Sequence, residues 1–145
     1  MEKLIFDSGI KEYELGAGIL RFNPSDPNVY ARFMDAIEEV KTIEQDMVEQ
    51  GKALKETDPA LNLLRDADTK VKAQLDAVFP GNCFDDLLEG VNLMATAGNG
   101  ERVVTNLLDA LTPIIEEGVE RFTNSAVNEA KANREQRRAA QKGQV

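Results

Sequence analysis

Apolar and polar positions near the start of the chain follow a period of two. Between residues 11 and 22, apolar side chains alternate with polar ones on both sides of Gly16-Ala17-Gly18. Such alternation is typical of half-buried strands, and glycine readily adopts the positive φ angles of a tight connection. The pattern predicts a β-hairpin over residues 11–22, which must pack on later segments because an isolated hairpin is marginally stable in water. The apolar patch at residues 3–6 is compatible with one further short strand.

The spacing changes to that of a helix after Asn23-Pro24-Ser25-Asp26-Pro27. Neither proline can donate to a strand ladder, so this segment ends the hairpin. It can also begin a helix, because the Asp26 carboxylate can accept from the first free N–H groups and Pro27 is favoured at the first helical position. Apolar residues at steps of three, four or seven then predict a helix over residues 27–55. They are Tyr30, Phe33, Ile37, Val40, Ile43, Met47 and Leu54.

Three further helices are predicted from similar signals. Thr57-Asp58-Pro59 opens a helix over residues 59–79, Pro80-Gly81 ends it, and a shorter helix is expected over residues 82–96. A last helix over residues 101–122 contains Pro113 and Gly118, which we expect to bend or weaken it. The fold class predicted is mainly α (α+β), an N-terminal β-hairpin followed by a small bundle of about four helices and a charged C-terminal tail.

Residues 1–123 are predicted to form a single globular domain, and residues 124–145 a basic tail. The tail holds five basic and two acidic residues, which give it a net charge of +3. Since the whole chain carries −9, residues 1–123 carry a net charge of −12. Apolar side chains larger than alanine nearly vanish from the tail, so it has no stripe with which to dock. Its many Ala, Glu, Arg and Gln residues are compatible either with a helix or with a flexible segment.

Composition narrows the compartment and the class of partner. A content of 42% hydrophobic and 30% charged residues suits a globular core, and the single cysteine excludes an intramolecular disulfide. No apolar run approaches the roughly 20 residues that span a bilayer, and none of signal-peptide length begins the chain. The negative net charge argues against nucleic acid and anionic membranes as partners. We therefore expect a cytoplasmic protein with protein partners.

The sequence offers little catalytic chemistry. Histidine is absent, which removes the commonest general base and neutral metal ligand. Cys83 is expected to be a buried structural residue, because Asp85 and Asp86 oppose thiolate formation. Residues 66–70 superficially suggest a calcium loop but lack its glycine and its bidentate glutamate, so they are expected to form a solvated helical face. The paired acids Asp85-Asp86 and Glu116-Glu117 are expected on the surface. No catalytic residue, cofactor or metal ion is predicted.

One segment resembles a known family. The order Tyr13-Glu14-Leu15, then Gly18-Ile19-Leu20-Arg21-Phe22-Asn23-Pro24-Ser25-Asp26-Pro27, then Tyr30-Ala31-Arg32-Phe33 resembles the N-terminal signature of small tail assembly chaperones from siphophages and prophages of Gram-positive bacteria. The segment from Ala67-Asp68 to Phe79-Pro80-Gly81, residues 83–88 and the charged tail are similar to later parts of those proteins. The resemblance covers residues 12–140, and its specific part is residues 18–33.

The resemblance implies a small α-rich, non-catalytic protein expressed during virion morphogenesis. Such chaperones bind the long hydrophobic tape measure protein and keep it soluble while tail-tube subunits polymerise around it. The tape measure protein and the tail-tube protein are the expected partners, and self-association is left open. The expected location is the cytoplasm of the infected or lysogenic bacterial host, with the protein absent from the mature virion. Many genes of this family also yield a longer product by ribosomal frameshifting near the end of the reading frame; a slippery run encoding Gln141-Lys142-Gly143 is a hypothesis that the nucleotide sequence tests, and the existence of such a product is left open.

A chaperone of this kind would present an apolar groove or helix face flanked by acids. The candidate partner-binding residues are Phe33, Ile37 and Val40, provided that they are partly exposed, and Leu107, Leu111 and Ile114. Four tail residues are candidates for contact with an acidic protein surface, because no aromatic residue lies among them for base stacking. They are Arg134, Arg137, Arg138 and Lys142. Two alternatives remain open: a virion structural component such as a head–tail connector or minor tail protein, and an enzyme or regulator with an unrecognised site.

Overall fold

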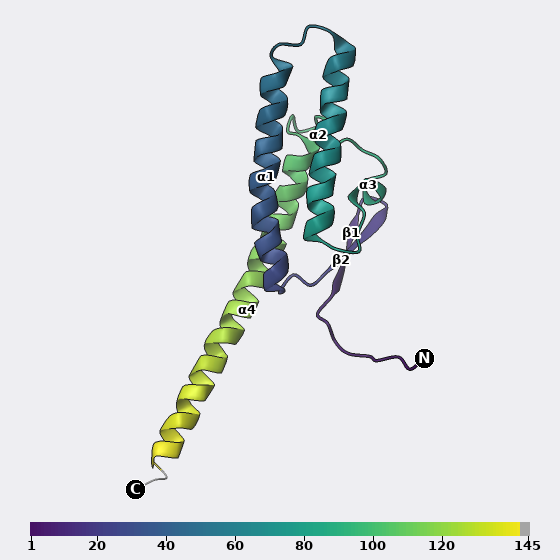
Figure 1. Cartoon of the computed structure of the whole chain (residues 1–145). Helices are drawn as coiled ribbons and strands as arrows, with labels where there is room; N and C mark the ends of the chain where they lie inside the picture. The colour runs from purple at the N-terminus through teal and green to yellow at the C-terminus, as the bar shows by residue number, and fades with distance from the viewer. Residues whose placement is uncertain (143–145) are drawn as a thin grey trace.

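Two antiparallel strands precede four helices in the computed structural model, which describes residues 1–142 (Figure 1). The elements are β1 (Lys11–Leu15), β2 (Gly18–Phe22), α1 (Pro27–Gly51), α2 (Thr57–Val78), α3 (Phe84–Leu87) and α4 (Val103–Lys142). This arrangement confirms the predicted mainly α fold with an N-terminal hairpin. Residues 3–6 form no strand. Gly143, the last residue of the segment considered for frameshifting, lies outside the described residues.

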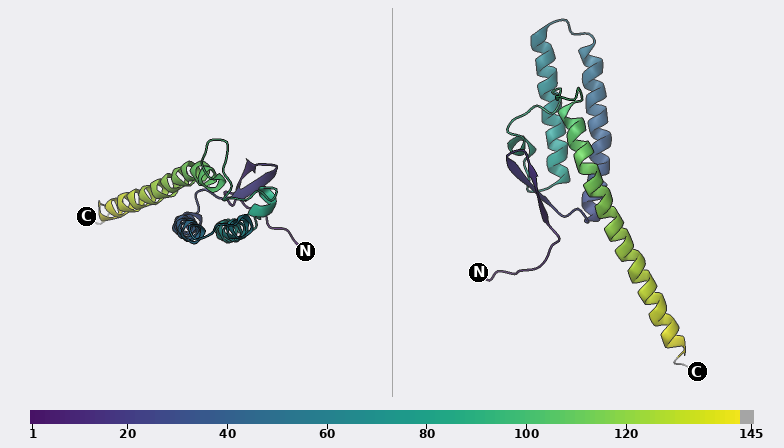
Figure 2. Two further views of the ribbon diagram at one scale, coloured as in Figure 1. Left: turned by 90° about the horizontal axis from the view of Figure 1, so that it is seen from above. Right: turned by 180° about the vertical axis from the view of Figure 1, so that it is seen from behind.

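The helices and the hairpin form two layers (Figure 2). The antiparallel pair α1 and α2 makes one layer, and the first half of α4, the hairpin and α3 lie across the other. The core between the layers contains residues from the hairpin and from every helix. Its largest fully buried side chains are Phe33, Phe79, Phe84, Leu20, Leu75, Leu93 and Ile115.

The hairpin predicted over residues 11–22 is confirmed and is anchored to the segment after α2. Tyr13 pairs with Leu20 and Leu15 with Gly18, so Gly16 and Ala17 form the two-residue turn, with Gly16 at a φ of 59°. On the outer edge of β2, the Asn82 side chain accepts from the Arg21 N–H at 3.0 Å and donates to the Arg21 carbonyl at 2.9 Å. This amide therefore closes part of an edge that would otherwise be unpaired.

The start of α1 confirms the predicted cap. Asp26 has extended backbone angles and its Oδ1 accepts from the Asn28 N–H at 2.9 Å, while Pro27 occupies the first helical position. The helix ends at Gly51 instead of residue 55. Leu54 is 37% exposed in the following turn, so no core contact favours continuing the helix. The second predicted helix is confirmed within two residues as α2, although its cap, Glu56, makes no side-chain cap bond.

The helix predicted over residues 82–96 is wrong for most of its length, because α3 covers only Phe84–Leu87. Glu89 and Gly90 follow with φ angles of 53° and 75°, which a right-handed helix cannot contain. Beyond this break, Leu93 and Met94 are buried although they lie in turns, whereas Val91 is exposed. Val104 donates to the Leu93 carbonyl at 2.9 Å and Val103 to the Ala95 carbonyl at 2.9 Å, which holds this segment against the start of α4.

The last helix is longer than predicted and includes the tail. α4 runs for 40 residues through both Pro113 and Gly118. Its first half packs on the core, and its second half projects away from the other elements (Figures 1 and 2). Every described side chain from Thr123 to Ala140 is exposed. The sequence left open whether the tail is helical or flexible, and in the structure it is helical. This helical tail has no apolar stripe that could dock on the body.

A candidate partner-binding groove between α1 and α4

The structure buries four of the six predicted partner-binding residues. Phe33 and Val40 are each 1% exposed, Leu111 is 4% exposed and Leu107 is 7% exposed. The condition of partial exposure therefore fails for Phe33 and Val40, because both lie in the core. Ile37 and Ile114 are partly buried side chains at the margin of the core. Only these two of the six are placed where a partner could reach a substantial part of the side chain.

A groove of about 290 Å³ lies between α1 and α4, and we call it the α1–α4 groove. Its lining comes from two stretches, one on each helix. The residues are Ile37, Val40, Lys41, Glu44, Thr105, Leu108, Asp109 and Thr112. Ile37 and Leu108 are half-buried, while Val40 lies beneath them in the core. The groove thus joins two of the predicted residues, Ile37 and Val40, to Leu108 of α4, which was not among the candidates.

The groove follows from the way in which α4 meets α1. α1 packs along α2 over most of its length but meets α4 over a shorter stretch. Val104, Leu107, Leu111 and Ile115 recur at steps of three and four and fill the core side of α4. Leu108 and Thr112 are each one position further round the helix, so they face the margin. The edge of the contact between the two helices is therefore lined by a second, partly exposed apolar strip.

Charged and hydroxyl groups surround this strip. Lys41 lies 3.5 Å from the Glu38 carboxylate, and both side chains are mostly exposed. Glu44 and Asp109 place a carboxylate on each helix, while the Thr112 hydroxyl donates to the Leu108 carbonyl at 2.7 Å and so needs no external partner. An apolar strip with a charged rim suits the apolar face of an amphipathic helix.

A second cluster surrounds Lys72, which the sequence analysis did not single out. The Lys72 side chain is 7% exposed, and its Nζ lies 2.9 Å from Asp68 Oδ2 and 2.6 Å from Asp85 Oδ1. Asp68 Oδ1 also accepts from the Leu93 N–H at 2.7 Å. Burial disfavours the charged ammonium, but the hydrogen bonds to Asp85 and Asp68 outweigh this effect and raise the pKa of Lys72 above its ordinary value. This cluster ties α2 to α3 and to the following turn.

The Lys72 cluster corrects the interpretation of residues 66–70 as a solvated face. Asp68 is 15% exposed and holds together two other segments, whereas Asp66 and Lys70 are exposed as expected. The signal that could have revealed the cluster is the i, i+4 pair of Asp68 and Lys72, although such pairs are usually exposed. Its third member, Asp85, comes from a separate element and could not be found by spacing.

The prediction of a buried Cys83 is wrong, because this side chain is exposed. Cys83 precedes α3 with an extended backbone, and the next residue, Phe84, occupies the core with 0% exposure. The Phe84 N–H is satisfied by Asp76 Oδ1 at 2.8 Å. The paired acids are exposed as predicted, and Asp85 contacts Lys72 from that exposed position.

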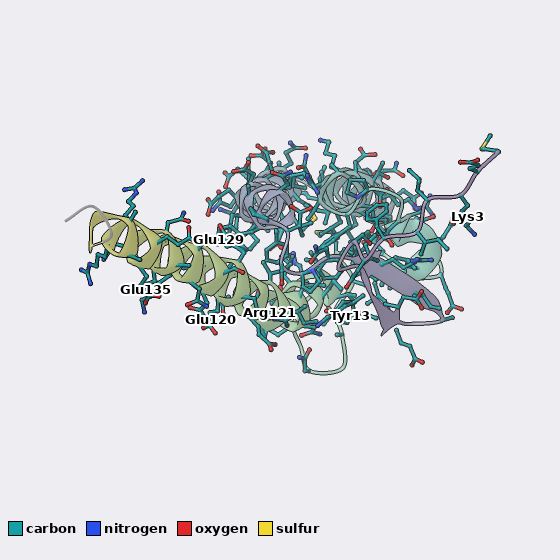
Figure 3. All side chains as sticks on the ribbon, turned by 90° about the horizontal axis from the view of Figure 1, so that it is seen from below. Lys3, Tyr13, Glu120, Arg121, Glu129 and Glu135 are labelled. Carbon is teal, nitrogen blue, oxygen red and sulfur yellow. The ribbon has the colours of Figure 1, made fainter. Side chains whose placement is uncertain are left out.

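Tyr13 lies on the hairpin and is labelled in Figure 3 together with Arg121 of α4. Its ring stacks on Phe22 at a centroid distance of 5.1 Å. Burial raises the pKa of Tyr13; Arg121 opposes this rise and Glu117 adds to it. Both charged residues belong to α4, so the charges of this helix act on the Tyr13 hydroxyl.

The tail candidates lie on the projecting part of α4, away from the groove. Arg134, Arg137 and Arg138 are exposed, whereas Lys142 is the last residue of the helix. Glu129 and Glu135 lie on the same projecting segment (Figure 3). Basic side chains near a helix C-terminus interact favourably with the helix dipole, which favours the helical form of the tail. The structure does not bring these arginines together with Ile37 or Leu108.

Within residues 1–142, no group of three His, Cys, Asp or Glu side chains is arranged to hold a metal ion. None of the described helices combines the length and the apolar character needed to cross a membrane. No family model, no curated protein and no solved structure matches the chain. The functional interpretation therefore depends on the geometry above and on the resemblance of residues 18–33.

Proposed function

We propose that this chain is a non-catalytic phage tail assembly chaperone that binds a helical segment of the tape measure protein in the α1–α4 groove. The observation that carries the proposal is the partly exposed apolar strip of Ile37 and Leu108 between two helices. A helix bound there would place its apolar residues against this strip and its polar residues toward the rim. The resemblance of residues 18–33 supplies the class of partner.

The distribution of charge supports the same proposal. The −12 charge of residues 1–123 favours solubility, which a protein that handles a hydrophobic client requires. The groove rim contains Lys41 as well as Glu44 and Asp109, so a client helix with charges of both signs beside its apolar face would fit. The protein would act in the cytoplasm of the bacterial host and be absent from the finished particle.

The alternative is a structural component of the virion, and one observation favours it. The projecting half of α4 is a long exposed helix, which could make permanent contacts with neighbouring subunits. Mass spectrometry of purified particles separates the two functions. Stoichiometric presence in the particle would contradict the chaperone proposal, whereas absence from the particle would contradict the structural alternative.

Co-expression with the neighbouring tape measure gene tests the chaperone proposal directly. We expect the wild-type chain to keep the tape measure protein in the soluble fraction, and Ile37→Asp or Leu108→Asp to reduce that fraction strongly. Val48→Asp is the matched control, because Val48 is 45% exposed on the same helix α1 but lies outside the groove. Thermal melts of each variant verify that the fold is intact. Equal solubility of the tape measure protein with and without this chain would refute the proposal.

A further inference from the structure

The N-terminal segment forms an extended arm whose apolar side chains have no cover. Leu4, Ile5 and Phe6 are 89%, 91% and 77% exposed, and they are consecutive in the sequence. Single exposed apolar residues are common on protein surfaces, but a contiguous apolar run is typical of a contact site. The arm leaves the body on the side away from the projecting half of α4 (Figures 1 and 2).

The root of the arm is fixed to the body by a defined turn. The Gly9 N–H donates to Asp7 Oδ1 at 2.8 Å, and Asn23 Nδ2 donates to the Ser8 carbonyl at 3.0 Å. Gly9 has a φ of 74°, and a Cβ at this position would come within 2.7 Å of Asn23 Nδ2. The turn therefore requires glycine and directs residues 1–6 away from the hairpin to which they are connected.

A hollow of about 280 Å³ lies beside this root, and we call it the root hollow. Buried apolar residues form its inner part, namely Phe22, Val29 and Phe79. Its rim carries Arg21, Arg32 and Asp26, while Ser8 and Ile10 of the arm's own root complete the lining. The arm has charges that complement this rim, because Glu2 and Lys3 precede the apolar run.

We propose that two copies of this chain exchange N-terminal arms, so that Phe6 of each copy occupies the root hollow of the other while Leu4 and Ile5 cover the surface around it. The arm and the root hollow share Ser8 and Ile10, so they form one continuous patch with a protruding part and a receiving part. Such a self-complementary patch is what a two-fold symmetric interface requires. Occupation of an arm's own hollow is disfavoured, because only Asp7 separates Phe6 from Ser8 and the turn points the chain outward.

The surface available reaches the lower range of specific interfaces. Two arms, each with one aromatic and two aliphatic side chains, and the surfaces that receive them remove on the order of 1,000 Å² from water. The projecting half of α4 and the α1–α4 groove take no part in this contact. The inference is therefore independent of the proposed chaperone function.

The absence of tryptophan from the chain makes the arm easy to follow. We expect Phe6→Trp to show an emission maximum that moves to shorter wavelength as protein concentration rises, in parallel with a doubling of mass in sedimentation equilibrium. A short-wavelength maximum at every concentration with the mass of a monomer would mean that the arm occupies its own hollow. A long-wavelength maximum at every concentration would mean that the arm stays in solvent. Either result overturns the proposal.

Substitutions in both parts of the patch provide the second test. We expect Phe6→Ser, on the arm, and Ile10→Ser, at the root hollow, each to weaken association by about tenfold or more, the effect of losing a buried anchor at an interface. Leu61→Ser is the matched control, since Leu61 is 46% exposed on α2 and far from the patch in sequence. Unchanged association in Phe6→Ser would overturn the arm exchange even if the chain were dimeric, because another surface would then hold the dimer.

Discussion

Lys72 shows how a single charged residue can join three segments. Its ammonium group contacts carboxylates from α2 and from α3, and one of those carboxylates also accepts from the Leu93 N–H. A buried ammonium is unfavourable unless it is paired, so each contact offsets part of the cost of removing the charge from water. We expect Lys72→Met to lower the free energy of unfolding by about 2 kcal/mol at neutral pH, because Asp68 would lose its partner.

The raised pKa of Lys72 also predicts a loss of stability at alkaline pH. Because the folded protein holds this proton more tightly than the unfolded chain, the contribution is complete below the ordinary lysine value of 10.5 and is lost as pH rises through the folded pKa. The pKa of Tyr13 is raised as well, so Tyr13 also makes the stability fall as pH rises above 10.0. The effect of Lys72 is therefore best measured in proteins that also carry Tyr13→Phe.

In the Tyr13→Phe background, the free energy of unfolding, measured with urea at a series of pH values, should decline more steeply at alkaline pH with Lys72 than with Lys72→Met. Equal slopes in the two proteins would contradict the assignment of this pH dependence to Lys72.

Gly118 is the second residue whose role depends on a distant segment. A Cβ at this position would overlap the Pro24 carbonyl, so α4 and the end of the hairpin can approach each other only if residue 118 is glycine. We expect Gly118→Ala to destabilise the fold by about 3 kcal/mol through this overlap, although the same change in an exposed helix is normally stabilising. Gly98→Ala is the control, because a Cβ there meets open space. Thermal unfolding of the two variants gives the comparison, and a Gly118→Ala protein as stable as the control would show that the segments can separate without cost.

These residues mark the limit of prediction from sequence at the residue scale. Phe33 and Val40 were placed correctly on the apolar stripe, but burial depends on whether another element covers that stripe. The stripe alone could not show that Phe33 packs near Phe79 in the core, or that Val40 is buried beside α4 while Ile37 lies at the margin. Similarly, Gly118 was interpreted as a weak point of its helix because its contact with Pro24 lies far away in sequence.

At the scale of elements, local signals predicted the starts of segments better than their ends. Asp26 and Pro27 act within one turn of chain, so the start of α1 could be read directly from residue type. The end of α1 at Gly51 depends on the absence of core contacts for Leu54. The break after α3 had a signal in Gly90, but the apolar residues beyond it imitated helical spacing although Leu93 and Met94 lie in turns.

The cap of α1 gives a prediction that separates stability from binding. We expect Asp26→Ala to lower the free energy of unfolding by about 1 kcal/mol, because the Asn28 N–H would lose its acceptor. The α1–α4 groove begins at Ile37, beyond this cap, so affinity for the tape measure segment that we propose binds there should stay unchanged under conditions where the variant is folded. Asp35→Ala, an exposed acid within α1, is the control. Thermal melts combined with titration of the partner would reveal an error if affinity fell while stability did not.

At the scale of the whole molecule, charge and shape divide the chain at the same place. The acidic part contains both layers of the core, and the basic part is the projecting half of α4. Because α4 is long, its basic end lies more than one Debye length from most of the acidic surface at physiological salt. The attraction between the two parts is therefore largely screened. The arm, the α1–α4 groove and the projecting helix thus lie at three different parts of the surface, and each is available without displacing another.

Removal of residues 124–145 tests whether residues 1–123 form an independent domain. The described side chains from Thr123 to Ala140 are exposed, so the midpoint of thermal unfolding should change by no more than about 2 °C, while the helical signal in circular dichroism falls with the lost segment. An Ala130→Gly, Ala132→Gly variant of the full chain is the control, because it weakens the projecting helix without shortening the protein. A large decrease of the midpoint in both proteins would show that the projecting helix stabilises the core, and the division at residue 123 would then be wrong.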